Sequence, residues 1–244
     1  MRKTVFNSLL AAVLIPGGMF TPFYGLNKNQ KSISIKSFRI DKYPVTNKEF
    51  LNFVQKYPSW QKENIAEPLA DGDYLKHWQG KASFEKLWNV PVTYVSWYAA
   101  QDYCKTQGGR LPTVFEWEYV GAASSTKKDA SHDPEFIKQL LKWYSKPTDE
   151  GKIPSIGHHK PNIFGVYDLH GGVWEWTYDF NGVFLTGDNR QEKDKLKNLF
   201  CGAAGEGAQN RVNYAAFMRY ALRNSLKAHY TLMNLGFRCA YDVP

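Results

Sequence analysis

The chain has 244 residues, of which 43% are hydrophobic and 16% aromatic, so it can build a sizeable core as one large domain or two small ones. Its formal net charge is +8, but the lysines are scattered through polar stretches instead of forming one block. We therefore expect a solvated surface that attracts acidic partners, and we exclude nucleic acid as a partner.

The first residues have the features of an export signal. Arg2 and Lys3 give a positive start, and residues 8–20 form an apolar run that Pro16 and two glycines interrupt. That run is too short to span a bilayer comfortably, and no small-x-small triplet or nearby Cys marks a cleavage site. We expect residues 1–25 to be a signal peptide or an uncleaved N-terminal anchor, which would be the one contact with a membrane. The rest should then be periplasmic or extracellular.

A strand and a capped helix are predicted next. Residues 31–43 alternate apolar and polar side chains in their first half, which predicts a strand. Thr46 and Glu49 form a capping box, and the apolar residues behind them recur at helical spacing, so residues 46–57 should form an amphipathic helix. Residues 59–89 carry aromatics without a clean period and indicate an irregular, well-packed insertion.

Two further helices follow with clear signals. Ser96 can cap a helix that carries Cys104 on its apolar face and ends at two glycines. Thr113 and Glu116 form a second capping box behind a proline, which predicts a short helix to about Ala122.

The second half of the chain is more polar. Residues 124–160 are typical of a surface excursion, with one helical candidate at residues 134–144. Residues 179–198 are polar again, and the chain closes with a helix at residues 214–223 and a strand at residues 237–241.

Residues 162–176, NIFGVYDLHGGVWEW, mix aromatics with glycines. Glycines weaken an ordinary strand, so this stretch indicates a shaped loop. Asp168, Gly171, Val173 and Glu175 could offer two carboxylates and two backbone carbonyls, an all-oxygen set that suits calcium. The alternative, equally open from these residues, is an aromatic core segment whose Glu175 is held by hydrogen bonds.

Five segments in a fixed order carry a family resemblance: FRIDKYPVTNKEFLNFV, PVTYVSWYAAQDYC, GGRLPTVFEWEYVGAA, NIFGVYDLHGGVWEW and NLGFRCA. Over about residues 32–242 the chain resembles the sulfatase-modifying-factor family, the formylglycine-generating enzyme and its relatives. The resemblance implies a single α+β domain of the C-type-lectin-like kind, with long aromatic-rich loops. Family membership alone does not settle the chemistry, because one fold hosts unrelated functions.

The resemblance pairs two of the three cysteines. Cys104 and Cys239 match cysteines that are bonded to each other in the family, and export would permit such a bond. Cys201 would then be the odd cysteine, with a free thiol.

The resemblance also implies a structural calcium ion. Family members carry such a site at the positions of Asp168, Gly171, Val173 and Glu175. Relatives often have Asn where this chain has Gly172. The ion would stiffen the loop and would take no part in catalysis.

The reactive cysteines of the family have no clear counterparts here. In formylglycine-generating members, a cysteine pair near the carboxy terminus binds copper(I) and drives oxidation of a sulfatase cysteine by dioxygen, and a thiolate pair suits this soft ion. The second position falls on Ala215 and the first around Glu206, away from Cys201. The resemblance thus assigns no catalytic residue to this chain. We interpret Cys201 and Met218 as a free thiol and a core methionine rather than as transient copper ligands.

Two other groups of charged residues are ambiguous. The six histidines lack the HxxxHxE spacing that iron-dependent relatives use. Arg219 and Arg223 share a helical face, and with Arg238 they could recognise a carboxylate or form structural ion pairs with Asp or Glu. We favour the ion pairs.

We predict an exported accessory, assembly or binding protein that lacks the reactive cysteine pair. The stretch YAAFMRYALRNSLKA resembles relatives that accompany copper nitrite reductases and other respiratory proteins, so the expected partner is a respiratory or copper protein. The alternative is a copper-dependent oxidase that converts a sulfatase cysteine to formylglycine. A carbohydrate-binding role ranks third.

Overall fold

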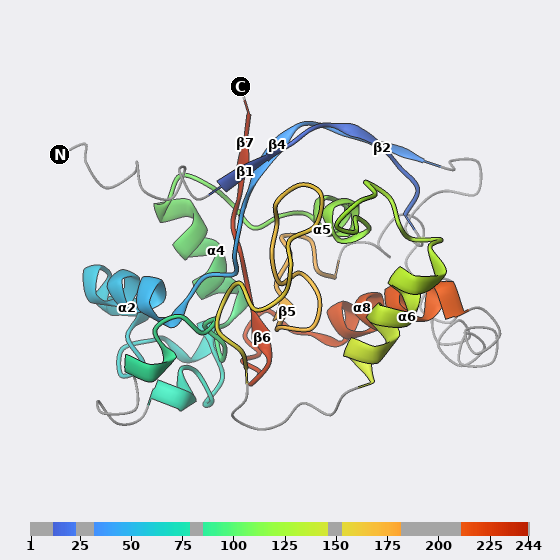
Figure 1. Cartoon of the computed structure of the whole chain (residues 1–244). Coiled ribbons are helices and arrows are strands. Elements are labelled where there is room, and N and C mark those ends of the chain that lie inside the picture. The colour runs from blue at the N-terminus through green and yellow to red at the C-terminus, as the bar shows by residue number, and fades with distance from the viewer. Residues whose placement is uncertain (1–11, 23–31, 79–84, 146–152, 182–210, 244) are drawn as a thin grey trace, which may run out of the picture.

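The computed structural model describes residues 12–22, 32–78, 85–145, 153–181 and 211–243. They form an α+β domain with short strands, a few helices and long irregular connections, which confirms the expected fold class (Figure 1). None of the helices in these stretches is both long and apolar enough to cross a membrane.

A three-stranded antiparallel sheet joins the two ends of the described chain. Its order is β1 (Ala12–Ile15), β4 (Phe38–Asp41) and β7 (Ala240–Asp242), with β4 in the middle. Buried and half-buried residues alternate along β4, which is the pattern of a strand with one face on the core.

A second antiparallel pair, β2 (Gly18–Phe20) and β3 (Ile33–Ile35), follows β1 and precedes β4. Gly17 lies at the break between β1 and β2. A Cβ atom on Gly17 would lie 2.7 Å from the Ile35 carbonyl oxygen, so only glycine allows the two backbones to come this close.

The apolar run near the amino terminus is part of the folded domain. Of residues 8–20, which we expected to be the apolar part of a signal or anchor, those from Ala12 onward form β1 and β2, and Ile15 is fully buried. A strand pair with a glycine break has the same apolar composition as a signal peptide, so composition did not distinguish them. Among the described residues, the strands of the folded domain thus begin at Ala12, ahead of the expected start at residue 32. Residues 1–11 lie outside the described residues.

The described α-helices are α2 (Asn47–Lys56), α4 (Trp97–Thr106), α5 (Val114–Gly121), α6 (Pro134–Tyr144) and α8 (Arg211–Ser225). Thr46, Ser96 and Thr113 cap their helices as predicted, and both capping boxes are complete. Asp133 caps α6. The helix predicted at residues 214–223 is confirmed and extends further at both ends as α8.

The region between α2 and α4 is an irregular insertion, as predicted. It is built on the 3-10 turns η1 (Pro58–Trp60), η2 (Glu67–Leu69), η3 (Lys76–Trp78) and η4 (Glu85–Leu87). Asn47 holds it to α2, because its Nδ2 donates to the Val90 carbonyl oxygen over 3.0 Å and its Oδ1 accepts from Trp78 Nε1 over 2.7 Å.

Two links attach the C-terminal segment to the rest of the domain. Cys104 of α4 and Cys239 form the expected disulfide, and both are fully buried. β5 (Trp174–Glu175) pairs in parallel with β6 (Leu235–Gly236), which fixes the 162–176 loop to the carboxy-terminal region. The final strand begins at Ala240, later than predicted.

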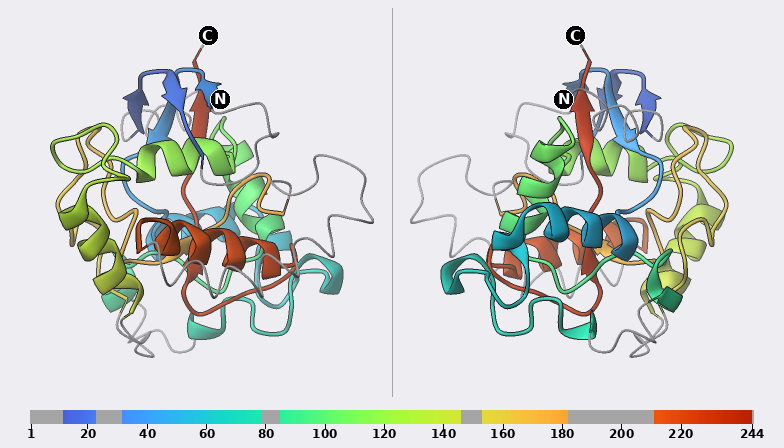
Figure 2. Two further views of the ribbon diagram at one scale, coloured as in Figure 1. Left: turned by 90° about the vertical axis from the view of Figure 1, so that its right-hand side faces the viewer. Right: turned by 90° about the vertical axis from the view of Figure 1, so that its left-hand side faces the viewer.

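Two apolar clusters form the main core. The larger lies between α2, α4 and the C-terminal segment, and the second lies between the strands and α5. Figure 2 shows α2 and α8 on opposite sides of the molecule, and α6 packs on α8. The 162–176 loop meets α5, α6 and α8, and the candidate site lies at this junction.

Candidate functional site

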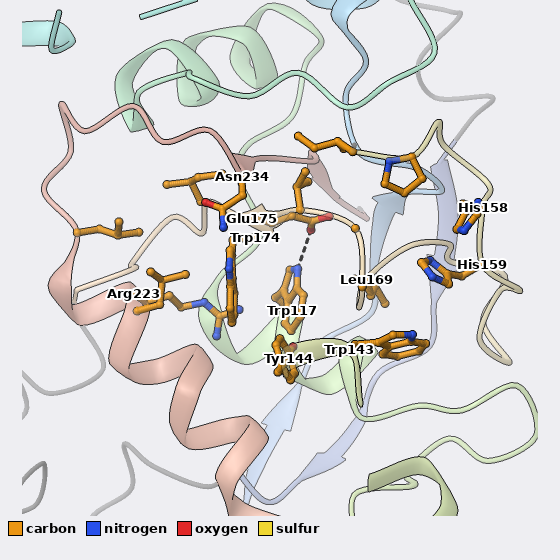
Figure 3. Close-up of a pocket in the computed structure, with 18 residues that line it drawn as sticks. Trp117, Trp143, Tyr144, His158, His159, Leu169, Trp174, Glu175, Arg223 and Asn234 are labelled. Atoms are coloured by element: carbon orange, nitrogen blue, oxygen red, sulfur yellow. Dashed lines mark hydrogen bonds between the residues drawn. The ribbon is translucent and has the colours of Figure 1, made fainter. Parts of the chain in front are cut away.

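A cavity of about 460 Å³ opens between α5, α6, α8 and the loop that precedes β5 (Figure 3). This volume lies in the range of small-molecule pockets, roughly 300 to 1,000 Å³. Aromatic, imidazole, amide and charged side chains line it: Trp117, Trp143, Tyr144, His158, His159, Trp174, Glu175, Arg223 and Asn234.

α6 contributes two of the aromatic walls. Leu140 is buried between α6 and α8, and Trp143 and Tyr144 follow three and four residues later on the same side of the helix. The ring of Tyr144 stacks on Trp174 with centroids 5.1 Å apart, and Trp143 stacks on His170 with centroids 5.8 Å apart. Stacking fixes the ring planes and gives the cavity flat walls.

His170 positions these rings. Its Nε2 lies 2.7 Å from the Gly121 carbonyl oxygen, and its Nδ1 lies 3.1 Å from the Tyr144 hydroxyl. A carbonyl oxygen only accepts, so Nε2 carries the proton and Nδ1 accepts from Tyr144. Burial, followed by the charge of Arg219, lowers the pKa of His170 to about 3. The neutral ring is a support for the wall and not a proton carrier.

Glu118 of α5 faces two arginines of α8. Arg219 donates through Nε and Nη2 over 2.6 to 3.1 Å, and Arg223 donates through Nη1 over 2.5 Å. Burial would raise the pKa of Glu118, but Arg219 and then Arg223 outweigh burial and hold that pKa at about 2. The sequence allowed Arg219 and Arg223 either to recognise a carboxylate ligand or to form structural ion pairs. In the structure they form ion pairs with Glu118, as we favoured.

Arg238 forms the second buried ion pair, with Glu175 of β5. Its Nη2 donates to Oε1 over 2.7 Å and its Nε to Oε2 over 2.8 Å, while Trp117 Nε1 donates to Oε2 over 2.7 Å. The other guanidinium hydrogens reach the carbonyl oxygens of Asp41 and Tyr167. Both charged side chains are 0% exposed, so this pair is closed to solvent.

Asp168 closes a turn of the loop that borders the cavity. Its φ of 54° is left-handed, and its two carboxylate oxygens accept from the backbone N–H groups of Gly157 and His159. His159 Nδ1 lies 3.2 Å from the same carboxylate. Asp168 therefore fixes His159 at the cavity edge, where its ring lies perpendicular to that of His158.

The two predicted calcium carboxylates serve different partners. Asp168 holds the 157–159 turn, and Glu175 is engaged by Arg238 and Trp117, while Gly171 and Val173 line the cavity between them. A calcium ion would have to share Glu175 with a guanidinium group. In the described part of the chain, no cluster of three or more His, Cys, Asp or Glu residues could hold a metal. A calcium site that also uses the backbone carbonyls of Gly171 and Val173 stays a prediction.

Ala215, where the resemblance places the second reactive cysteine, is a buried methyl group on α8. It is 2% exposed and packs with Phe136 and Leu140 of α6. Cys201 and Glu206 lie outside the described residues.

Much of the cavity wall was not predicted from the sequence. We described residues 124–160 as a surface excursion, but α6 buries its apolar face and brings Trp143 and Tyr144 to the cavity. The signal was present in the amphipathic spacing of residues 134–144, which continues into these two aromatics. Trp174 and Glu175 were predicted only as loop or calcium residues.

Comparison with known proteins agrees with the fold and the motifs. The family pattern described as "Sulfatase-modifying factor enzyme 1-like domain" matches residues 2–243. The mouse protein "Inactive C-alpha-formylglycine-generating enzyme 2" is 27% identical over 94% of this chain and 85% of its own length. The mouse "Formylglycine-generating enzyme" is 27% identical over 96% of this chain and 76% of its own length.

A solved structure supports the same fold. The crystal structure of CarF is similar to this chain with a TM-score of 0.50 at 14% identity, covering 96% of this chain and 98% of CarF. The family match spans nearly the whole sequence, including β1 and β2. The chain therefore belongs to the sulfatase-modifying-factor family and has the formylglycine-generating-enzyme-like fold.

Proposed function

We propose that this chain is a binding or accessory member of its family that does not generate formylglycine. The cysteine count carries the proposal: the sequence has three cysteines and the disulfide uses two, which leaves one (3 − 2 = 1). The copper chemistry expected of the active relatives needs a pair of thiolates, which suits soft copper(I) better than one thiolate does. Cys201 alone cannot replace that pair.

The surroundings of Ala215 support the same proposal. Side chains of α6 cover this position, so a substrate thiol has no open path to it. A methyl group there offers neither a nucleophile nor a metal ligand.

The names of the relatives do not decide between the two functions. One mouse relative is called inactive and another is called formylglycine-generating, and both are 27% identical to this chain. Because the two identities are equal, the function has to be inferred from individual residues. The cysteine count favours a protein that does not generate formylglycine.

We propose the cavity as the binding site. It combines flat aromatic walls with a small number of polar groups, which is the usual composition of a ligand pocket. The proposed macromolecular partner is a respiratory or copper protein, on the basis of the resemblance in residues 214–228. The proposed location is an oxidising compartment outside the cytoplasm, because the disulfide needs one.

An activity assay tests the absence of oxidase chemistry. The purified chain is incubated with copper, oxygen and a peptide that contains Cys-x-Pro-x-Arg, and the aldehyde product is measured by mass spectrometry, with an active formylglycine-generating enzyme as the positive control. We expect no product. Product that disappears in Cys201→Ser would restore the copper-dependent oxidase as the function.

A thiol count tests the premise directly. The denatured, unreduced protein should contain one free thiol, and three would contradict the disulfide.

Co-purification from the native source, followed by mass spectrometry, should then identify a partner whose recovery falls with Trp174→Ala. Recovery that is unchanged in this variant would place binding elsewhere.

A further inference from the structure

The buried ion cluster beside the cavity carries an excess of positive charge. One carboxylate, Glu118, faces two guanidinium groups, Arg219 and Arg223, and all three side chains are at most 8% exposed. Asp179 is within electrostatic reach of Arg223, but burial raises the pKa of Asp179 and its carboxylate accepts from the Val114 N–H over 2.7 Å. No hydrogen bond joins Asp179 to Arg223 in the described residues. The charge on Arg223 therefore lacks a close counterion of its own.

The two arginines use their donors differently. Arg219 directs Nε and Nη2 to Glu118 and Nη1 to the Tyr144 hydroxyl over 3.4 Å. Arg223 directs Nη1 alone to Glu118, and its Nε and Nη2 have no acceptor among the residues that the structure describes. Arg223 lines the cavity, and Arg219 does not.

Arg223 is held in position for a ligand. Its guanidinium lies 4.7 Å from the ring centroid of Trp117, which fixes the plane of the group by a cation–π contact. Figure 3 shows it beside the cavity with Trp174 and Tyr144. Trp174 lines the cavity, its indole N–H has no acceptor in the described part of the chain, and an indole nitrogen can only donate. The unused side-chain hydrogen-bonding groups of Arg223 and Trp174 are therefore donors.

We infer that the cavity binds a monovalent carboxylate carried on a flat, largely apolar body, with Arg223 as its ion-pair partner. Three observations carry this inference, which rests on the proposed function of the cavity as a binding site. The spare Nε and Nη2 form a planar fork that fits a planar carboxylate. The excess of one positive charge matches one negative charge better than it matches a phosphate dianion. The stacked rings of Tyr144 and Trp174 offer flat walls to the body of the ligand.

Matched probes test the inference on the full chain by isothermal titration calorimetry. The probes are indole-3-acetate and its neutral analogue indole-3-acetamide, a short peptide that ends in Trp with a free or an amidated carboxyl terminus, and inorganic phosphate. We expect each carboxylate to bind at least about tenfold more tightly than its amide, because a hydrogen bond to a charged group usually contributes this much. The two probe pairs distinguish a free acid from a protein carboxyl terminus as the source.

Arg223→Gln should abolish the preference for the carboxylate, and Arg223→Lys should keep only part of it, because lysine retains the charge but loses the fork. Arg223→Gln should fold, since Glu118 keeps Arg219, and Arg223→Lys provides the test if it does not. Lys227→Gln is the matched control: it removes the same charge from an exposed residue four positions further along, just beyond the end of α8, and it should leave the carboxylate preference unchanged.

The outcomes separate this inference from the proposed function. Equal binding of acid and amide, both lost in Trp174→Ala, would overturn the carboxylate inference and keep the cavity as a binding site. A preference that survives Arg223→Gln, or phosphate binding tighter than that of indole-3-acetate, would also overturn it. Binding of no probe would contradict both proposals.

Discussion

Two buried glutamate–arginine clusters border the same cavity, and they differ in stoichiometry. Glu175 faces one arginine, Arg238, whose remaining donors reach backbone carbonyls, and both side chains are 0% exposed. Glu118 faces Arg219 and Arg223, and the second arginine retains donors beside the cavity. A balanced, satisfied cluster stabilises a fold, whereas an unbalanced cluster at a cavity can also bind a ligand.

The largest expected effect comes from breaking the balanced cluster. Arg238→Gln leaves the Glu175 carboxylate buried without its counterion, and such a loss typically destabilises a protein by about 3–5 kcal/mol. Urea denaturation followed by Trp fluorescence measures the change in the free energy of unfolding. A loss below about 1 kcal/mol would mean that water or another cation replaces Arg238.

Acidification tests the unbalanced cluster. The folded state lowers the pKa of Glu118 from 4.5 to about 2, so this carboxylate contributes stability that is present above pH 4.5 and is lost as the pH falls toward 2. The difference corresponds to about 3 kcal/mol. Glu118→Gln should lower the stability at pH 7 and flatten the decline in acid. An unchanged acid decline in this variant would show that other groups cause it.

A smaller effect is expected from removing the extra arginine. Arg223→Gln removes the hydrogen bond of Arg223 to Glu118 and its contact with Trp117, but Glu118 keeps its pairing with Arg219, so we expect a loss of about 2 kcal/mol. Urea denaturation of Arg223→Gln and Arg238→Gln side by side gives the comparison. Equal destabilisation by the two substitutions would remove the distinction between the clusters.

Chelation should have the smallest effect. The calcium site predicted from the resemblance would make the melting temperature fall in EGTA, but Glu175 and Asp168 already accept hydrogen bonds from protein donors. The predicted calcium site therefore implies only a small fall in the melting temperature by calorimetry, with calcium found by elemental analysis of the purified protein. An unchanged melting temperature and no bound calcium would contradict the ligand set Asp168, Gly171, Val173 and Glu175.

Local signals in the sequence predicted much of the fold. The capping boxes at Thr46 and Thr113 fixed two helix starts, because a cap depends on residues within one turn. The Cys104–Cys239 pairing came from the family motifs and could not have come from spacing. The strands at residues 12–20 were not predicted, since an apolar run with glycines suits an edge strand and a signal peptide equally well.

The site was harder to predict because its contacts are distant in sequence. Arg219 and its partner Glu118 are 101 positions apart, and nothing near either residue identifies the other. The sequence placed Arg219 and Arg223 on one helical face. It did not show which of the two would keep unused hydrogen-bond donors. That difference depends on α6, whose Tyr144 accepts from Arg219 alone.

Ligand-induced stabilisation of the wild type and of Arg223→Gln tests the central claim most directly. Indole-3-acetate at ten times its dissociation constant should raise the unfolding free energy of the wild type by about 1.4 kcal/mol. The same concentration should raise the unfolding free energy of Arg223→Gln by only about 0.4 kcal/mol, the value for tenfold weaker binding, with Lys227→Gln behaving as the wild type in the same thermal shift assay. An equal shift in wild type and Arg223→Gln would contradict the account, because the extra guanidinium would then have no role in binding.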